Sequence, residues 1–160
     1  MEKLLKTVYN SRKISSALKI TSHAAVFISM LSYVAVIALL YIEEPIMAVR
    51  GVLATAIPFV IVSVARLLIN APRPYELYNF YEKRPKDKSG QSFPSRHVFS
   101  AFLVATVAYS VSIPLMIVNL VLGVAIAVSR VLLGMHFIRD VACGFLIGIV
   151  SGVVGILILM

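Results

Sequence analysis

The chain has 160 residues, enough for one compact domain, and 60% of them are hydrophobic, more than the roughly 45–50% of a soluble domain. Its formal net charge is +8, but no basic stripe is interleaved with base-stacking aromatics, which argues against a nucleic-acid partner. The apolar residues gather in runs of roughly 20, the length that crosses a bilayer core of about 30 Å. We therefore predict an all-α, polytopic membrane helix bundle built as a single domain over residues 1–160.

The first residues combine apolar and basic side chains at helical spacing. Leu4, Leu5 and Val8 alternate with lysines, which predicts an interfacial amphipathic helix over residues 1–20, its basic side toward lipid headgroups. A frayed tail is the alternative. Apolar runs then follow at about 24–42, 47–70, 95–112, 114–133 and 141–160. We expect about five transmembrane helices from these runs.

Two of the later segments have a distinctive composition. Residues 71–93 are polar, and the aromatic side chains among them suit a membrane interface: Tyr75, Tyr78, Phe80 and Tyr81. The last apolar run carries glycines at four-residue spacing, Gly144, Gly148 and Gly152, which predicts that another helix approaches it closely. The single cysteine, Cys143, is interpreted as a small buried membrane residue.

Polar side chains gather at one end of the expected spans. Because consecutive spans alternate in direction, segments distant in sequence deliver their ends to the same side of the membrane. The residues on that side are Arg66, Arg73, Ser95, Arg96, His97, Ser129, Arg130, His136, Arg139 and Asp140. A charge at the depth of Arg66 is costly in a membrane and marks a functional candidate. This gathering of cations and imidazoles predicts an anion site.

A helix is expected to begin inside this group of residues. Pro94 and Ser95 are residue types that favour a helix start. The N-terminus of a helix offers free N–H groups and the positive end of a dipole, which both favour phosphate. His97 would then lie in the first turn and face that anion.

The second chemical feature is a histidine four residues before an aspartate. If residues 136–140 are helical, His136 and Asp140 share one face of the helix. A carboxylate on one imidazole nitrogen fixes the tautomer and leaves the other nitrogen free to attack. His23 has no such partner and is interpreted as a polar residue of the membrane interface.

These segments resemble the type 2 phosphatidic acid phosphatase (PAP2) family, whose pattern has three parts. The parts are Lys-x6-Arg-Pro, Pro-Ser-Gly-His and Ser-Arg-x5-His-x3-Asp, matched here by Arg66 with Arg73-Pro74, by Pro94-Ser95-Arg96-His97, and by Ser129-Arg130 with His136 and Asp140. The match spans residues 66–140. Arg66 in place of Lys keeps the charge but changes its geometry. Arg96 in place of Gly adds a side chain that contacts or crowds the headgroup, which bears on substrate scope.

The resemblance implies a role for each matched residue. His136 attacks phosphorus and becomes phosphohistidine, Asp140 orients it, and His97 protonates the leaving oxygen and then activates water. The phosphate oxygens are held by Arg66, Arg73, Ser95, Arg96 and Arg130. No metal or other cofactor is implied. Arg139 is interpreted as an interface cation, and Ser129 either serves the motif or only packs and caps.

The implied substrate is a membrane lipid phosphate. Candidates are undecaprenyl pyrophosphate, phosphatidylglycerol phosphate, phosphatidic acid, a phosphorylated polyprenyl sugar and lipid A, hydrolysed at a phosphomonoester or a pyrophosphate. Two rival functions remain open: a lipid-phosphate binding or transport protein without hydrolysis, and a lipid phosphotransferase. The paired histidines with Asp140 argue against simple binding, which needs cations but no nucleophile.

The expected location is a prokaryotic cell membrane, because a small chain without extra domains resembles the bacterial or archaeal members of the family. Lys and Arg are concentrated on the active-site side, whereas the other side has Glu43, Glu44 and only Arg50. The positive-inside rule therefore favours a cytoplasmic site. Many bacterial members of the family that this chain resembles work on the outer face of the membrane. The charge distribution and the family resemblance therefore indicate opposite sides.

Overall fold

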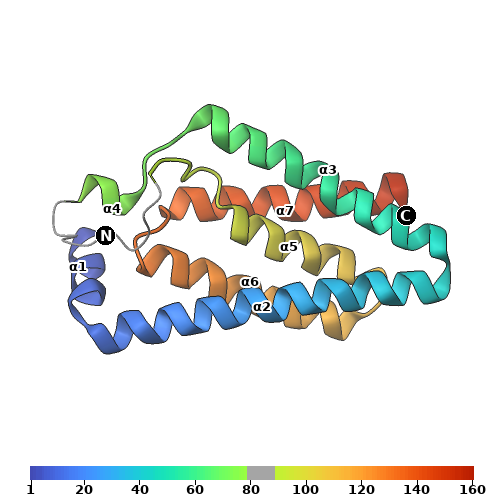
Figure 1. Ribbon diagram of the computed structural model, residues 1–160, viewed down its shortest axis with the longest axis horizontal. Helices are drawn as coiled ribbons and strands as arrows, with labels where there is room; N and C mark the ends of the chain where they lie inside the picture. Colours follow the sequence, from blue (N-terminus) through green and yellow to red (C-terminus); the bar gives the residue numbers. More distant parts are fainter. Residues whose placement is uncertain (79–88) are drawn as a thin grey trace.

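The structure is a computed structural model that describes residues 1–78 and 89–160, and every regular element in these ranges is a helix (Figure 1). The elements are α1 (Glu2–Asn10), α2 (Arg12–Glu43), α3 (Pro45–Ile69), α4 (Pro74–Leu77), α5 (Arg96–Ala108), α6 (Ile113–Leu132) and α7 (Ile138–Leu159). Phe80 and Tyr81, expected at a membrane interface, lie outside the described residues. So do Lys83, Arg84, Lys86 and Lys88, which add to the positive charge expected on the active-site side.

The expected membrane helix bundle is confirmed. Helices α2, α3, α6 and α7 are each long and apolar enough to cross a membrane, and only 22–28% of their most apolar windows is buried inside the protein. The remaining apolar faces are therefore available to lipid. The fifth expected span, 95–112, is a shorter helix: α5 has 13 residues, which is about 20 Å at a rise of about 1.5 Å per residue.

Helix α5 lies at the centre of the bundle and packs against α2, α3, α6 and α7 (Figure 1). Its side chains Val98, Phe99 and Leu103 are fully buried. The glycines of α7 allow this approach, because a β-carbon on Gly148 would lie 2.6 Å from the carbonyl oxygen of Phe99. The close helix contact expected from the glycine spacing is thus present, and α5 is the partner.

Buried polar side chains join α2 to α6 inside the bundle. Asn119 of α6 donates to Ser32 at 2.6 Å and accepts from Ser29 at 3.1 Å. It also donates to the carbonyl oxygen of Leu115 in its own helix. Hydrogen bonds of this kind hold membrane helices together without any hydrophobic driving force, so this cluster is structural.

The N-terminal amphipathic helix is present but shorter than expected. Helix α1 ends at Asn10, and Ser11 caps the next helix by accepting a hydrogen bond from the Ile14 N–H. Residues 12–20 therefore belong to α2, not to an interfacial helix over 1–20. Leu5 and Val8 are buried and α1 packs on α2 and α6, so part of its apolar face serves the protein.

One end of the bundle collects the segments that the sequence interpretation placed together. The end of α3, α4, the start of α5, the end of α6 and the start of α7 meet there, with α1 beside them (Figure 1). The C-terminus lies at the opposite end (Figure 1). The candidate residues of the sequence analysis therefore converge on one side of the membrane bundle.

Candidate active site

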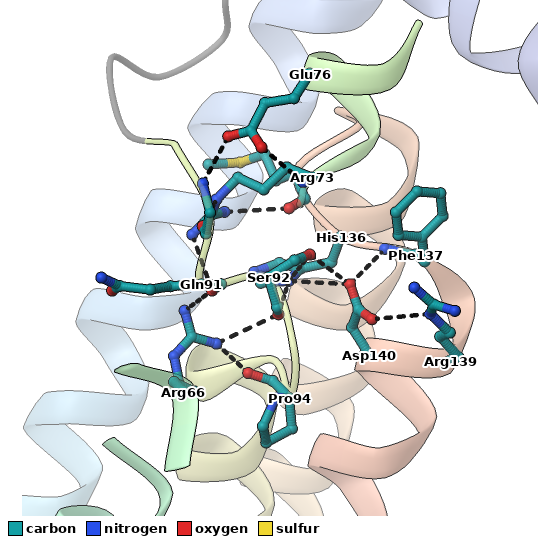
Figure 2. A network of polar contacts seen from close by, with 12 residues as sticks. Arg66, Arg73, Glu76, Gln91, Ser92, Pro94, His136, Phe137, Arg139 and Asp140 are labelled. Atoms are coloured by element: carbon teal, nitrogen blue, oxygen red, sulfur yellow. Dashed lines mark hydrogen bonds and ion pairs between the residues drawn. The ribbon is translucent and has the colours of Figure 1, made fainter. Parts of the chain in front are cut away.

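A short backbone segment, residues 90–95, crosses this end of the bundle and leads into α5. Gly90 and Gln91 both have positive φ, 63° and 53°, a conformation that glycine adopts without penalty. A β-carbon on Gly90 would also lie 2.2 Å from Oδ1 of Asn70. The 90–95 segment thus follows a tight path, and several of its carbonyl oxygens point toward arginines (Figure 2).

Two buried arginines hold this segment by its carbonyl oxygens. Arg66 donates to the carbonyls of Gln91, Ser92 and Pro94. Arg73 donates to Gly90 at 2.9 Å and Gln91 at 3.3 Å, and also to the carbonyl of Met135 at 3.1 Å. Each of these acceptors is a main-chain carbonyl oxygen. Arg73 therefore connects the 90–95 segment to the α6–α7 loop.

Glu76 secures the same segment from the other side. Its carboxylate accepts from the backbone N–H of Gly90 at 2.7 Å and from that of Arg73 at 3.1 Å (Figure 2). Glu76 is the third residue of α4, which Pro74 begins. Sequence reasoning did not select Glu76, because a glutamate beside a long polar segment is usually a solvated side chain.

Ser92 lies between the histidine and aspartate that the sequence paired (Figure 2). Nδ1 of His136 is 2.8 Å from the carbonyl oxygen of Ser92 and 3.7 Å from Oδ2 of Asp140. The Ser92 hydroxyl donates to Oδ2 of Asp140 at 2.5 Å. All three residues are buried. Sequence reasoning missed Ser92, since nothing in its type or spacing separates it from Ser89.

The pairing of His136 with Asp140 is present, but the expected reason for it is wrong. Helix α7 begins at Ile138, so residues 136–140 are not one helix and His136 lies in the preceding loop. Asp140 turns back toward this loop because Oδ2 accepts from the backbone N–H of Phe137 at 2.9 Å. A capping contact at the helix start therefore brings the two side chains together.

Some buried polar atoms of the site have no hydrogen-bond partner within the described part of the chain. They are Ser95 Oγ, Arg130 Nε and Asp140 Oδ1. Arg130 does contact the Met135 sulfur through Nη1 at 3.2 Å. Buried polar groups are normally hydrogen-bonded, so the unsatisfied donors of Ser95 and Arg130 make these two residues candidates for contacts with an anionic ligand. Ser95 itself is fixed by its N–H, which donates to the Asp140 carbonyl at 2.9 Å.

The remaining candidates lie around this centre. His97 is half-buried in the first turn of α5. Arg96 is exposed, and its guanidinium lies 5.5 Å from the centroid of the Phe59 ring on α3. Arg139 is also exposed, with Nε 3.6 Å from Oδ1 of Asp140. Ser129 donates to the Ala125 carbonyl within its own helix, as a packing residue would.

The electrostatics of the site favour a neutral His136. Burial lowers the pKa of His136, and the positive charges of Arg73 and Arg66 lower it further, while Asp140 opposes the change. A neutral imidazole keeps a lone pair on one nitrogen and can act as a nucleophile. Among the described residues, no group of three or more His, Cys, Asp or Glu side chains comes together to hold a metal ion.

The fold and the site together define a multi-pass membrane protein with buried arginines and a buried histidine–aspartate pair at one end of its helix bundle. The chain belongs to the PAP2 superfamily, whose sequence model matches residues 47–159. This membership confirms the resemblance drawn from the motifs and supports a lipid phosphatase as the class of protein.

Two solved structures are similar to the whole chain. LpxE from Aquifex aeolicus superposes with a TM-score of 0.72 at 23% identity, covering 96% of this chain and 93% of that one. The first transmembrane PAP2 type phosphatidylglycerolphosphate phosphatase from Bacillus subtilis gives a TM-score of 0.63 at 22% identity, covering 96% and 90%. At these identities the likeness establishes the shared fold.

Proposed function

We propose that this protein is a lipid phosphate phosphatase that works through a phosphohistidine on His136. The observation that carries the proposal is the position of His136, whose Nδ1 is held by the Ser92 carbonyl at 2.8 Å beside the carboxylate of Asp140. Binding a phosphate requires cations, but it does not require an oriented and neutral imidazole. The arrangement therefore supports chemistry in addition to binding.

The proposed phosphate cradle combines three arginines with the start of α5. Arg66, Arg73 and Arg130 are buried, and a guanidinium has five N–H donors, so each retains donors for phosphate oxygens beyond its contacts within the protein. The Ser95 hydroxyl and the N–H groups at the start of α5 complete the cradle. Arg96 contributes its backbone N–H, while its side chain is directed to Phe59.

The first half-reaction transfers the phosphoryl group to the enzyme. The lone pair on Nε2 of His136 attacks phosphorus, and the bond from phosphorus to the lipid oxygen breaks with its electron pair going to that oxygen. His97 donates a proton to the leaving oxygen. The arginines stabilise the charge on the non-bridging oxygens, which is the main requirement of phosphoryl transfer.

The second half-reaction restores the enzyme. His97, now without its proton, accepts a proton from water as the water oxygen attacks the phosphohistidine. The phosphorus–nitrogen bond breaks, its electron pair returns to Nε2 of His136, and inorganic phosphate leaves. No step requires a metal ion. If an acceptor hydroxyl takes the place of water, the same steps give a phosphotransferase.

The substrate is proposed to be a phosphomonoester or diphosphate of a membrane lipid, such as undecaprenyl pyrophosphate, phosphatidylglycerol phosphate or phosphatidic acid. The site lies at the end of helices whose outer faces are apolar, so a lipid tail can stay in the bilayer while its headgroup enters. One similar structure is described as a phosphatidylglycerolphosphate phosphatase, which places that lipid among the first to assay.

The test is phosphate release by detergent-solubilised protein with a chelator present. We expect wild-type protein to release phosphate and to form an acid-labile phosphoprotein, and His136→Ala to abolish both. His23→Ala is the matched control, because His23 is exposed on α2 and should leave activity unchanged. Release by His136→Ala, or a strict need for a divalent metal, would refute the mechanism. Binding without release would support the binding-protein alternative.

A further inference from the structure

Both the main chain and the side chain of Ser92 contact the pair formed by His136 and Asp140 (Figure 2). The Ser92 hydroxyl oxygen lies 3.4 Å from Nδ1 of His136, and two shorter contacts accompany it. The main-chain carbonyl oxygen of Ser92 is 2.8 Å from Nδ1 of His136. Its side-chain hydroxyl donates to Oδ2 of Asp140 at 2.5 Å. The direct distance from Nδ1 of His136 to Oδ2 of Asp140 is 3.7 Å, beyond the range of a hydrogen bond.

The carbonyl contact determines which imidazole nitrogen carries the proton. A carbonyl oxygen only accepts hydrogen bonds, so the 2.8 Å contact with the Ser92 oxygen requires a proton on Nδ1 of His136. In the neutral ring, Nε2 then holds the lone pair. This assignment does not depend on the charge of Asp140, in contrast to a pair in which the carboxylate accepts the imidazole proton directly.

The hydroxyl contact determines where the carboxylate lies. Oδ2 of Asp140 accepts from the Ser92 hydroxyl and from the Phe137 N–H at 2.9 Å. These two donors hold Oδ2 beside the imidazole, so its charge faces the ring that becomes positive on attack. Asp140 therefore acts on His136 mainly through its charge, and Ser92 supplies the link between them.

The position of Ser92 is itself well determined. Its N–H donates to the Ala71 carbonyl at 2.9 Å, and its carbonyl oxygen also accepts from Arg66 at 3.4 Å. The residue has 0% of its surface exposed. Because the N–H and the carbonyl oxygen of Ser92 are both hydrogen-bonded, its backbone is fixed. A hydroxyl on a fixed backbone is suited to orienting a neighbouring side chain.

We propose that Ser92 is a positioning residue for the nucleophile: its carbonyl holds His136 as the Nδ1–H tautomer, and its hydroxyl fixes Asp140 beside the ring. The catalytic meaning of this arrangement rests on the proposed phosphatase function. The tautomer itself can be measured without any substrate, so the two proposals fail in distinguishable ways.

The decisive experiment is nitrogen NMR of the imidazoles in detergent-solubilised protein labelled with 15N-histidine. The chain has three histidines, and His23→Gln and His97→Gln identify the His136 signals by elimination. We expect the Nδ1–H tautomer for neutral His136 in the wild type and in Asp140→Asn. A change to the Nε2–H tautomer in Asp140→Asn would overturn the proposal, since it would make the carboxylate the orienting group.

A kinetic experiment tests the hydroxyl separately. Ser92→Ala keeps the carbonyl but removes the donor to Asp140. We expect kcat to fall about 10- to 100-fold, by analogy with the loss of a supporting hydrogen bond behind a metal-bound histidine. KM should stay unchanged. Ser92→Thr, which keeps the hydroxyl, should recover kcat. Ser89→Ala is the matched control, because Ser89 is exposed.

The pH profile separates positioning from a loss of packing. The charged groups that act on His136 are Asp140 of α7, Arg73 at the start of α4 and Arg66 of α3. Without the Ser92 hydroxyl, Asp140 is held less firmly beside the ring and raises the pKa of His136 less, so the acidic limb of kcat/KM should move to lower pH. A fall in kcat with an unmoved limb, or no fall at all, would overturn the role of the hydroxyl.

Discussion

A β-carbon placed on Gly144 of α7 would lie 2.7 Å from the carbonyl oxygen of Ser95, at the start of α5. Real atoms do not approach this closely, so the two helices meet here through bare backbone. The same two elements are joined by the hydrogen bond from the Ser95 N–H to the Asp140 carbonyl at 2.9 Å. The absence of a side chain at Gly144 therefore allows the close approach between the start of α5 and the turn of α7 that carries Asp140.

Gly144→Ala should consequently lower activity by more than the loss of folded protein accounts for. The added methyl group pushes against backbone that cannot rotate away, and overpacking of this kind costs about 1–3 kcal/mol. We expect a lower midpoint of thermal unfolding in detergent and a fall in kcat/KM for phosphate release. Gly155→Ala is the matched control, because its methyl group would meet Ala54 at 2.8 Å on α3, far along α7 from the site.

The control decides how the result is interpreted. Gly155→Ala should lower the unfolding midpoint similarly while kcat/KM per folded molecule stays close to wild type. If both variants lose the same activity, the effect of Gly144 is general packing and not site geometry.

Glu76→Gln should lower the rate of substrate turnover, because it loosens the 90–95 segment that carries part of the site. The two carboxylate oxygens accept from the N–H groups of Gly90 and Arg73, one each. Glutamine has only one oxygen, and its NH2 group is a donor, so one of the two N–H groups loses its acceptor. Leaving a buried donor unpaired costs about 1–3 kcal/mol. We expect kcat/KM to fall about tenfold, or about 1.4 kcal/mol. Glu44→Gln, exposed at the opposite end, should have no effect.

The pH dependence should show a nucleophile that stays neutral in mild acid. Protonated His136 cannot attack, and burial together with Arg73 and Arg66 lowers the pKa of His136 despite the opposing Asp140. Activity should therefore persist below the ordinary pKa of histidine and disappear as the pH falls through the lowered value. A profile of kcat/KM against pH measures this limb. A limb centred above the ordinary histidine value would contradict the prediction.

The active-site end is expected to face the cytoplasm. Lys3 and Lys6 of α1 are exposed at that end, whereas Glu43 and Glu44 are exposed at the other, and the positive-inside rule then places the site inside. Met160 lies opposite the site (Figure 1). Reporters fused after Met160 should therefore be active when they require export and inactive when they require the cytoplasm. The reverse pattern would place the site on the outer face.

Several features of this protein follow from sequence alone. Long apolar runs have one stable solution in lipid, the helix, because every backbone group must be satisfied within its own segment. The alternation of spans then placed Arg66, Arg73, His97, His136 and Asp140 at one end without any knowledge of packing. The motif spacing indicated the family, which the match over residues 47–159 confirms.

The tertiary structure decided what surrounds those residues. It showed that Arg66 and Arg73 hold the 90–95 segment by its carbonyls, that α5 is short and central, and that Ser92 lies between His136 and Asp140. Every residue carries a carbonyl oxygen, so a site built on carbonyls leaves no signature in residue type. Ser92 and His136 are 44 positions apart, and only the packing of α5 against α7 brings such distant segments into hydrogen-bonding contact.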